Sequence, residues 1–301
     1  MSWIETRSLF LIFSGLSILG CGQPTDRGNI STPVRKPNPV GYDLSNPDKV
    51  LFLPPILSEI SGITNIDSSK VACVQDENGI VFIFDMAKNE ISDQFTFHYP
   101  GDYEGIAKVS GAFYVLRSDG ALFETGNDKS SASAQQIPST AGISADYEGL
   151  CYDRRNQRLL IVPKNNPDRG PGYEKKHPVY ALDLQNDKDA ATEAFELDLP
   201  EITRYAAENN IKVSDEDKVT SLMVSDIGVH PLTNMLYVIS AVNRMLFVFD
   251  DDRSITYMEE LRPDLFSMPE GISFLDNGDM LISNEGRTNP ASIMLFRYRT
   301  K

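Results

Sequence analysis

A glycine returns along this chain at a nearly constant interval, and the residues around its copies resemble one another. The intervals between successive copies are 43, 44, 79 and 43 residues. The five glycines are Gly62, Gly105, Gly149, Gly228 and Gly271. A fixed period of this length is typical of repeated units that stack or surround an axis, and it argues against one irregular core.

Each glycine is followed by short apolar runs that alternate with turns. After Gly228, the runs Met235–Ser240 and Met245–Asp250 are separated by the residues Ala-Val-Asn-Arg. Runs rich in Val, Ile, Phe and Tyr between Asn, Asp and Gly are typical of antiparallel strands joined by hairpins. Units of about 40 residues with three or four such strands predict an all-β fold, a five-bladed β-propeller.

The long interval between Gly149 and Gly228 leaves two interpretations. We expect an insertion at about residues 185–225, which lacks the strand-turn-strand pattern and in which residues 200–209 form a short helix with a proline in its first turn. A sixth blade within this interval is the alternative.

The last repeat ends one strand short of a complete blade. An unpaired strand edge invites aggregation, so another segment must cover it. The apolar run Lys49–Leu53 at the start of the domain has no place in the repeats. We therefore predict that it pairs with Ser292–Arg297 and closes the ring, and that deleting residues 46–55 abolishes cooperative folding.

The first 41 residues have the composition of an export segment and a tether. Residues 1–20 carry an apolar run too short to span a bilayer, which is typical of a signal peptide, and Leu19-Gly20-Cys21 resembles a bacterial lipobox. We expect lipidation at Cys21, a Pro-rich tether over 21–41, the propeller over 42–301, and anchoring to a membrane of the cell envelope without crossing it. An ordinary secretory signal with an incidental cysteine is the alternative.

The net charge limits which partners the protein can bind, and the cysteine content bears on disulfide bonds. The formal net charge of −15 repels nucleic acid and attracts cations. The remaining cysteines, Cys73 and Cys151, lie in apolar runs of different repeats, so we expect two buried free thiols. The core must then hold the exported domain together.

Catalytic motifs of the common kinds are missing from this sequence, and acids beside the repeat glycine are the most distinctive polar feature. Rotational repetition would bring these acids to one end of the axis, where carboxylates either share protons or hold a cation. Oxygen ligands without nearby histidine or thiolate favour Ca²⁺. The candidate ligands are Glu104, Glu148 and Glu270, with Glu59, Asp102, Asp146 and Asp226 nearby. A purely structural role of the Glu-Gly pair, with the glycine giving close packing, is the alternative.

Other polar residues stand at the ends of the second strands and are candidates for binding a ligand. They are Gln75, Arg117, Lys164, Asn284 and Glu285. Arg117 and Lys164 could meet an anionic ligand, but we favour the interpretation that they are counter-ions for the acids.

Several of these motifs together resemble the SdiA-regulated proteins. The resemblance rests on the lipobox, the Pro-rich tether, Glu59-Ile-Ser-Gly-Ile, Asp-Tyr-Glu-Gly at 102 and 146, and Pro269-Glu-Gly-Ile. It covers about residues 42–299 and implies a five-bladed propeller with a structural calcium ion, on an envelope protein whose activity is not established. We expect a module that binds a small ligand or a protein partner on one face.

A second resemblance is to calcium-dependent propeller phytases, which also use Asp-x-Glu-Gly at the start of blades. It implies a phosphoester hydrolase whose activity needs basic residues around the metal. The candidates here are Arg117 and Lys164, with Arg169, Lys175 and Lys176 on a nearby loop. A protein-interaction scaffold that uses the 164–178 and 185–225 loops is a third possibility.

Overall fold

The computed structural model of this chain describes residues 38–126, 135–137, 145–185, 190–211, 222–287 and 289–299. The predicted signal peptide, the lipidation site Cys21 and most of the tether lie outside the described residues. A folded unit spans Lys36–Lys301. No helix within the described ranges is both long and apolar enough to cross a membrane.

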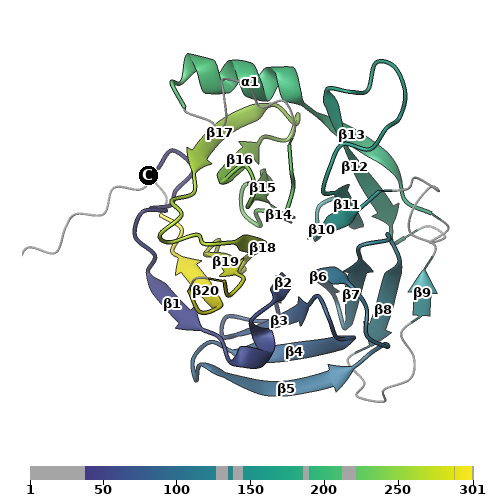
Figure 1. The fold of residues 1–301 in the computed structure, drawn as a ribbon, viewed down its shortest axis with the longest axis vertical. Helices are drawn as coiled ribbons and strands as arrows, with labels where there is room; N and C mark the ends of the chain where they lie inside the picture. The colour runs from purple at the N-terminus through teal and green to yellow at the C-terminus, as the bar shows by residue number, and fades with distance from the viewer. Residues whose placement is uncertain are drawn as a thin grey trace, which may run out of the picture. The chain divides into compact units, whose positions relative to one another are not determined.

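Five four-stranded antiparallel sheets surround one axis, so the predicted five-bladed propeller is confirmed (Figure 1). Blade 1 contains β2 (Ile60–Asn65), β3 (Lys70–Gln75), β4 (Ile80–Asp85) and β5 (Glu90–Thr96). Blade 2 contains β6 (Tyr103–Val109), β7 (Ala112–Arg117), β8 (Leu122–Gly126) and β9 (Gln135–Ile137). Blade 3 contains β10 (Tyr147–Asp153), β11 (Arg158–Pro163), β12 (Lys176–Asp183) and β13 (Thr192–Asp198).

The last two blades complete the ring. Blade 4 contains β14 (Asp226–Val229), β15 (Leu236–Ser240), β16 (Met245–Phe249) and β17 (Ile255–Glu260). Blade 5 contains β18 (Pro269–Phe274), β19 (Met280–Asn284), β20 (Ser292–Phe296) and, at its outer edge, β1 (Lys49–Phe52). β1 pairs with β20 in antiparallel register, with Lys49 opposite Leu295 and Phe52 opposite Ser292. The predicted closure by the N-terminal run is therefore confirmed.

The apolar core is divided into five wedges, one between each pair of neighbouring blades. The wedge between blades 5 and 1, for example, joins Leu51 and Ile293 of one blade to Ile63 and Phe82 of the next. Side chains alternate along a strand, so each blade contributes apolar side chains to the wedges on both of its sides. No single blade can bury its own faces, and stability depends on completing the ring.

The insertion between the third and fourth repeats is shorter than the sequence predicted. β13 belongs to blade 3 itself, so the departure from the sheet begins only after Asp198. The helix α1 (Leu199–Glu208) follows, and Asp198 caps it by accepting a hydrogen bond from the Glu201 amide at 2.9 Å. The helix lies beside β17 at the outside of the ring, with Ile202 buried (Figure 1). A sixth blade is not present among the described sheets.

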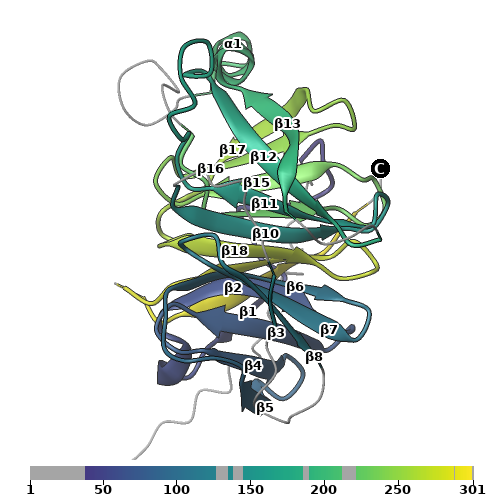
Figure 2. The same ribbon diagram turned by 90° about the vertical axis from the view of Figure 1, so that its right-hand side faces the viewer.

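A short 3₁₀ turn, η1 (Pro55–Leu57), leads from β1 to the innermost strand of blade 1. Tight turns occur at Asp119-Gly120 and Asn277-Gly278, where Gly120 and Gly278 have φ angles of 84° and 90°. Such positive φ values favour glycine. Figure 2 shows the innermost strands running along the axis of the ring.

Candidate functional site

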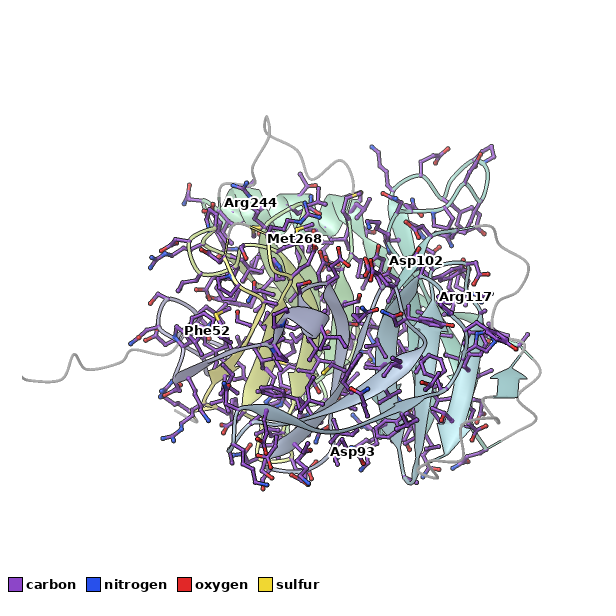
Figure 3. The ribbon with its side chains drawn as sticks, turned by 60° about the horizontal axis from the view of Figure 1, so that its bottom comes forward. Phe52, Asp93, Asp102, Arg117, Arg244 and Met268 are labelled. Atoms are coloured by element: carbon purple, nitrogen blue, oxygen red, sulfur yellow. The ribbon has the colours of Figure 1, made fainter. Side chains whose placement is uncertain are left out.

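The five innermost strands begin at the same end of the axis, and we call this end the axial mouth. It contains the starts of β2, β6, β10, β14 and β18, which contact one another in a closed circle. Figure 3 shows Asp102 and Met268 at this end of the ring, with oxygen atoms gathered between them. The residues around the repeat glycines, which are far apart in the sequence, therefore lie together at one end of the axis.

The three glutamates that directly precede a repeat glycine lie at β-bulges. In blade 2, Tyr103 pairs with Arg117 and Gly105 with Leu116, so Glu104 has no opposite residue. The register shifts in the same way at Glu148 in blade 3 and at Glu270 in blade 5. A bulge re-aims a side chain that would otherwise alternate into the blade interface. The three glutamates thus share a backbone device as well as a sequence motif.

Blade 4 lacks this device. Asp226, Ile227 and Gly228 pair in unbroken register with Ile239, Val238 and Tyr237. Without the bulge, the residue before the glycine is a buried isoleucine, and no glutamate reaches the mouth from this blade. Its contribution is Ser225, which forms a hydrogen bond to the Glu270 carboxyl.

The repeat glycines bring neighbouring innermost strands into contact. A Cβ atom at Gly62 would lie 2.8 Å from the Ile106 amide nitrogen, and one at Gly271 would lie 2.8 Å from the Ser61 carbonyl oxygen. Separations below about 3 Å are overlaps of van der Waals radii, so a side chain would push the blades apart. The packing role of the glycine, expected as the alternative reading of the Glu-Gly pair, is therefore present.

The glutamates of the mouth act on one another electrostatically. Burial, followed by the charges of Glu148 and Asp102 and a hydrogen bond to Asp102, raises the pKa of Glu104 to about 10. Burial also raises the pKa of Glu148 to about 7, opposed by Lys164 and reinforced by Asp146. Because like charges resist simultaneous ionisation, this group retains protons at neutral pH.

Blade 5 and blade 1 extend the same network around the axis. Burial and the charges of Glu148 and Glu285 raise the pKa of Glu270 to about 7. Burial and the charges of Glu59, Glu77, Asp102 and Glu285 raise the pKa of Asp76 to about 6. Nine carboxylates are thus linked: Glu59, Asp76, Glu77, Asp102, Glu104, Asp146, Glu148, Glu270 and Glu285.

Two basic side chains accompany these nine acids in the described part of the chain. The Lys164 ammonium forms an ion pair with Glu148, whose side chain is buried. Arg287, which is exposed, lies 3.3 Å from Glu285. The expected role of Lys164 as a counter-ion for the acids agrees with this contact. The negative charge of the mouth is only partly balanced.

Asp226 takes a different position from the one the sequence suggested. Its two carboxylate oxygens accept hydrogen bonds from the amides of Leu150 at 3.2 Å and Ile272 at 2.9 Å. The side chain is buried, and burial raises its pKa well above the usual range. Asp226 joins blades 3, 4 and 5 below the mouth, so its oxygens are already engaged. The sequence could not show that blade 4 lacks the bulge.

The remaining ligand candidates are scattered in their contacts. Arg117 pairs with Asp119 through hydrogen bonds of 3.0 and 2.8 Å and lies over the Phe123 ring, so it is not a counter-ion of the mouth glutamates. The Gln75 side chain accepts from the amides of Glu77 and Asn78 and holds a turn. Asn284 is buried beside Glu285, and neither polar atom of its side chain has a hydrogen-bond partner.

Asp76 and Ser225 were not among the predicted site residues. Asp76 follows β3 directly, and its sequence context, Asp-Glu-Asn-Gly, indicated only a hairpin turn. Its Oδ1 atom is buried without a hydrogen-bond partner. An acid at the inner end of a second strand was the available signal, because that end meets the start of the innermost strand.

The site has the chemistry for a hard cation but not a preassembled coordination shell. Among the described residues, no three His, Cys, Asp or Glu side chains already lie close enough together to hold a metal ion. Carboxylate oxygens are suitable ligands for Ca²⁺. Binding would require these side chains to move together, lose protons and compete with Lys164. Both cysteines of the described residues, Cys73 and Cys151, are free thiols, the first buried and the second partly buried.

The fold is a five-bladed β-propeller, and its repeated acids lie at one end of the axis. The sequence profile described as SdiA-regulated matches residues 48–288. This chain therefore belongs to the SdiA-regulated family. A search among curated proteins found no match.

Solved structures with a similar fold have very different sequences. The glutaminyl cyclase of Myxococcus xanthus aligns over 84% of this chain and 96% of its own, with a TM-score of 0.52 and 10% identity. A streptogramin B lyase aligns over 81% and 71%, with a TM-score of 0.43 and 16% identity. Similarities at this level concern the fold alone.

Proposed function

We propose that this protein is a lipid-anchored, calcium-binding β-propeller of the cell envelope, and that its axial mouth is a binding module for a ligand or partner. The observation that carries the proposal is the linked set of nine carboxylates with two basic partners. Attachment to the membrane is through Cys21, within the lipobox of the sequence.

Two features favour a cation over a purely structural arrangement. Hydrogen bonds and ion pairs within the protein do not neutralise the mouth, since the pKa values of Glu104, Glu148 and Glu270 are raised. Elevated pKa values mean that ionised carboxylates are disfavoured, so a divalent ion would gain by replacing the retained protons. Oxygen donors select Ca²⁺ over softer metals.

The ion's proposed role is to neutralise the glutamates and hold the starts of the blades together. Glu104, Glu148 and Glu270 come from three blades, so their shared ion would link segments far apart in the sequence. The loops around the mouth would then be fixed for a partner. No covalent chemistry is required of the site.

The decisive experiment is calcium titration of the chelator-treated protein by calorimetry at pH 8. We expect saturable binding, with release of protons that shows as a dependence of the measured heat on the buffer. Changing Glu104, Glu148 and Glu270 together to Gln should weaken binding at least tenfold. A triple variant of the exposed Glu90, Glu208 and Glu260 to Gln, which removes the same number of carboxyl groups, is the control. Equal affinities of the two triple variants would refute the placement.

Lys164 provides a second test of the same site. Its ammonium competes with a metal ion for Glu148. Lys164→Met should therefore raise calcium affinity, whereas Arg117→Met, which removes a cation paired with Asp119, should leave it nearly unchanged. A loss of affinity in Lys164→Met would show that the lysine supports the site rather than competing for it.

The phosphoester hydrolase alternative has less support from contacts. Arg169 pairs with Glu193 and Glu196, and Lys176 with Glu196. These basic groups already have acidic partners, and Lys164 has Glu148. Calcium-dependent turnover of a phosphomonoester, abolished by Glu148→Gln, would favour the enzyme over the binding module.

A further inference from the structure

A second concave site lies at the far end of the axis from the mouth. The cavity has a volume of about 400 Å³. Residues from the later parts of all five innermost strands line it, among them Thr64, Lys108, Leu150, Val229 and Phe274. These strands start at the mouth and run along the axis, so their later residues reach the opposite end (Figure 2). We call this space the distal cavity.

Asp226 separates the distal cavity from the mouth. Leu150 and Ile272 line the cavity, and their amides donate to the two Asp226 oxygens. On the other side, the charge of Glu148 acts on Asp226. A buried carboxylate held by three blades therefore stands between the two sites.

The lining of the distal cavity has the opposite charge from the mouth. Its twenty lining residues include Lys108, Arg154 and Arg155 but no Asp or Glu. The whole chain has 43 acidic and 28 basic residues, so this composition is a reversal of the average. A cavity lined by charges of one sign raises the local concentration of ligands with the opposite charge.

Lys108 is the basic group most available to a ligand. Its Nζ atom donates to the Ile66 carbonyl oxygen at 3.4 Å, and no carboxylate of the described ranges pairs with it. Arg154 and Arg155 are exposed at the rim and pair with Asp276 and Asp251, at 2.8 and 2.7 Å. The rim thus keeps one positive charge beyond its own ion pairs.

The walls combine apolar surface with hydroxyl donors. Ile106, Leu150 and Phe274 provide apolar contacts. Thr64 and Ser273 accept hydrogen bonds from backbone amides of neighbouring blades, at 3.2 and 3.1 Å. A hydroxyl that accepts a bond keeps its own proton to donate. This is the pattern of a small-molecule site, in which apolar walls surround a few polar groups.

We propose that the distal cavity is a second binding site, whose ligand is a small amphipathic anion. Its apolar body packs against the walls, and its carboxylate, sulfonate or phosphate group lies at the rim beside Lys108. The volume of about 400 Å³ suits a molecule of one or two rings or a short acyl chain. The site is distinct from the calcium site proposed at the mouth and does not depend on it.

The experiment uses 8-anilinonaphthalene-1-sulfonate, an aromatic anion whose fluorescence rises in an apolar environment, with the full mature chain. We expect one saturable site. Changing both Lys108 and Arg154 to Glu should weaken binding at least tenfold. The control changes Lys88 and Arg262, exposed basic residues that do not line the cavity, both to Glu, and gives the same change of net charge. Equal loss in both double variants, or no loss in either, would overturn the proposal.

Competition separates the ligand class from general apolar binding. Decanoate should displace the probe, and decyltrimethylammonium, with the same chain and the opposite charge, should not. Calorimetry of decanoate binding gives an independent measurement that does not rely on fluorescence. Equal displacement by the two detergents would refute the preference for an anion.

Discussion

A Cβ atom at Gly105 would lie 2.6 Å from the Cβ atom of Leu150, which belongs to the next blade. Strands β6 and β10 can therefore approach as they do only because this residue has no side chain. A similarly close approach occurs at Gly62 and Gly271, and it explains why the repeated motif contains a glycine. The adjacent residue of the phrase is then free to carry an acid.

Gly105→Ala should destabilise the domain by about 1 to 3 kcal/mol, because the methyl group must displace Leu150 or the neighbouring backbone. Gly149→Ala is the matched control, since the nearest atom to its Cβ is Cγ1 of Ile227 at 3.3 Å. We expect a clearly smaller effect there. Urea unfolding of both variants measures the difference, and equal midpoints would contradict the packing argument.

Closure of the ring by β1 can be tested with two adjacent residues that face opposite ways. Leu51 is buried between blades 5 and 1, while Phe52 is 59% exposed. Leu51→Ala should cost about 2 to 5 kcal/mol of unfolding free energy. Phe52→Ala should cost under about 1 kcal/mol, as is usual for surface sites. A larger loss in Phe52→Ala would mean that β1 does not pack with this register.

Asp226→Asn should destabilise the domain by about 1 to 3 kcal/mol, because an amide can replace only one of the two accepting oxygens and leaves a buried donor facing a backbone amide. Asp146→Asn changes the same charge at an exposed position of the mouth. Thermal unfolding of the two variants should show a lower midpoint for Asp226→Asn alone. If both variants have the same unfolding midpoint as the wild type, Asp226 does not hold the blades together.

Stability of the calcium-free protein should fall as pH rises from about 5 to 8. The folded-state pKa values of Glu104, Glu148 and Glu270 lie above that of an unfolded glutamate, so the folded state binds more protons in this range. When the native state binds more protons, unfolding free energy decreases with pH. Denaturation in urea with chelator, at pH 5.5 and 8, measures this slope.

Glu104→Gln is the control for this dependence. A neutral amide removes the glutamate whose pKa is raised most among the three, to about 10. The variant should show a flatter pH dependence and a higher midpoint than wild type at pH 8. Saturating calcium should likewise raise the wild-type midpoint at pH 8. A wild-type midpoint that rises with pH in chelator would contradict the assignment of these pKa shifts.

The repeat period and the strand pattern were sufficient to predict the number of blades and the closing strand. Hydrophobic alternation and turn residues are local properties, and the 43-residue interval adds the unit length. The sequence placed β13 in the insertion, since Thr192–Asp198 follows a polar stretch and is itself poor in apolar residues. Its assignment to blade 3 depends on pairing with β12, which is a tertiary contact.

The sequence predicted only those residues of the candidate site that belong to the repeated Glu-Gly motif. Glu104, Glu148 and Glu270 carry the motif and meet at the mouth. Asp226 stands two residues before the repeat glycine Gly228, but the unbroken register of blade 4 turns it inward to two backbone amides. A one-residue shift in register moves a side chain to the other face, and composition does not record it.

The sequence by itself therefore determined the fold, because periodic burial and turns are written along the chain. Only the tertiary structure decided which acids share protons, that Lys164 pairs with Glu148, and that a positively lined cavity lies beyond Asp226. These properties depend on distances between residues tens of positions apart. Ionisation and cavity lining are set by what each side chain meets across the axis, and that is fixed only when the ring closes.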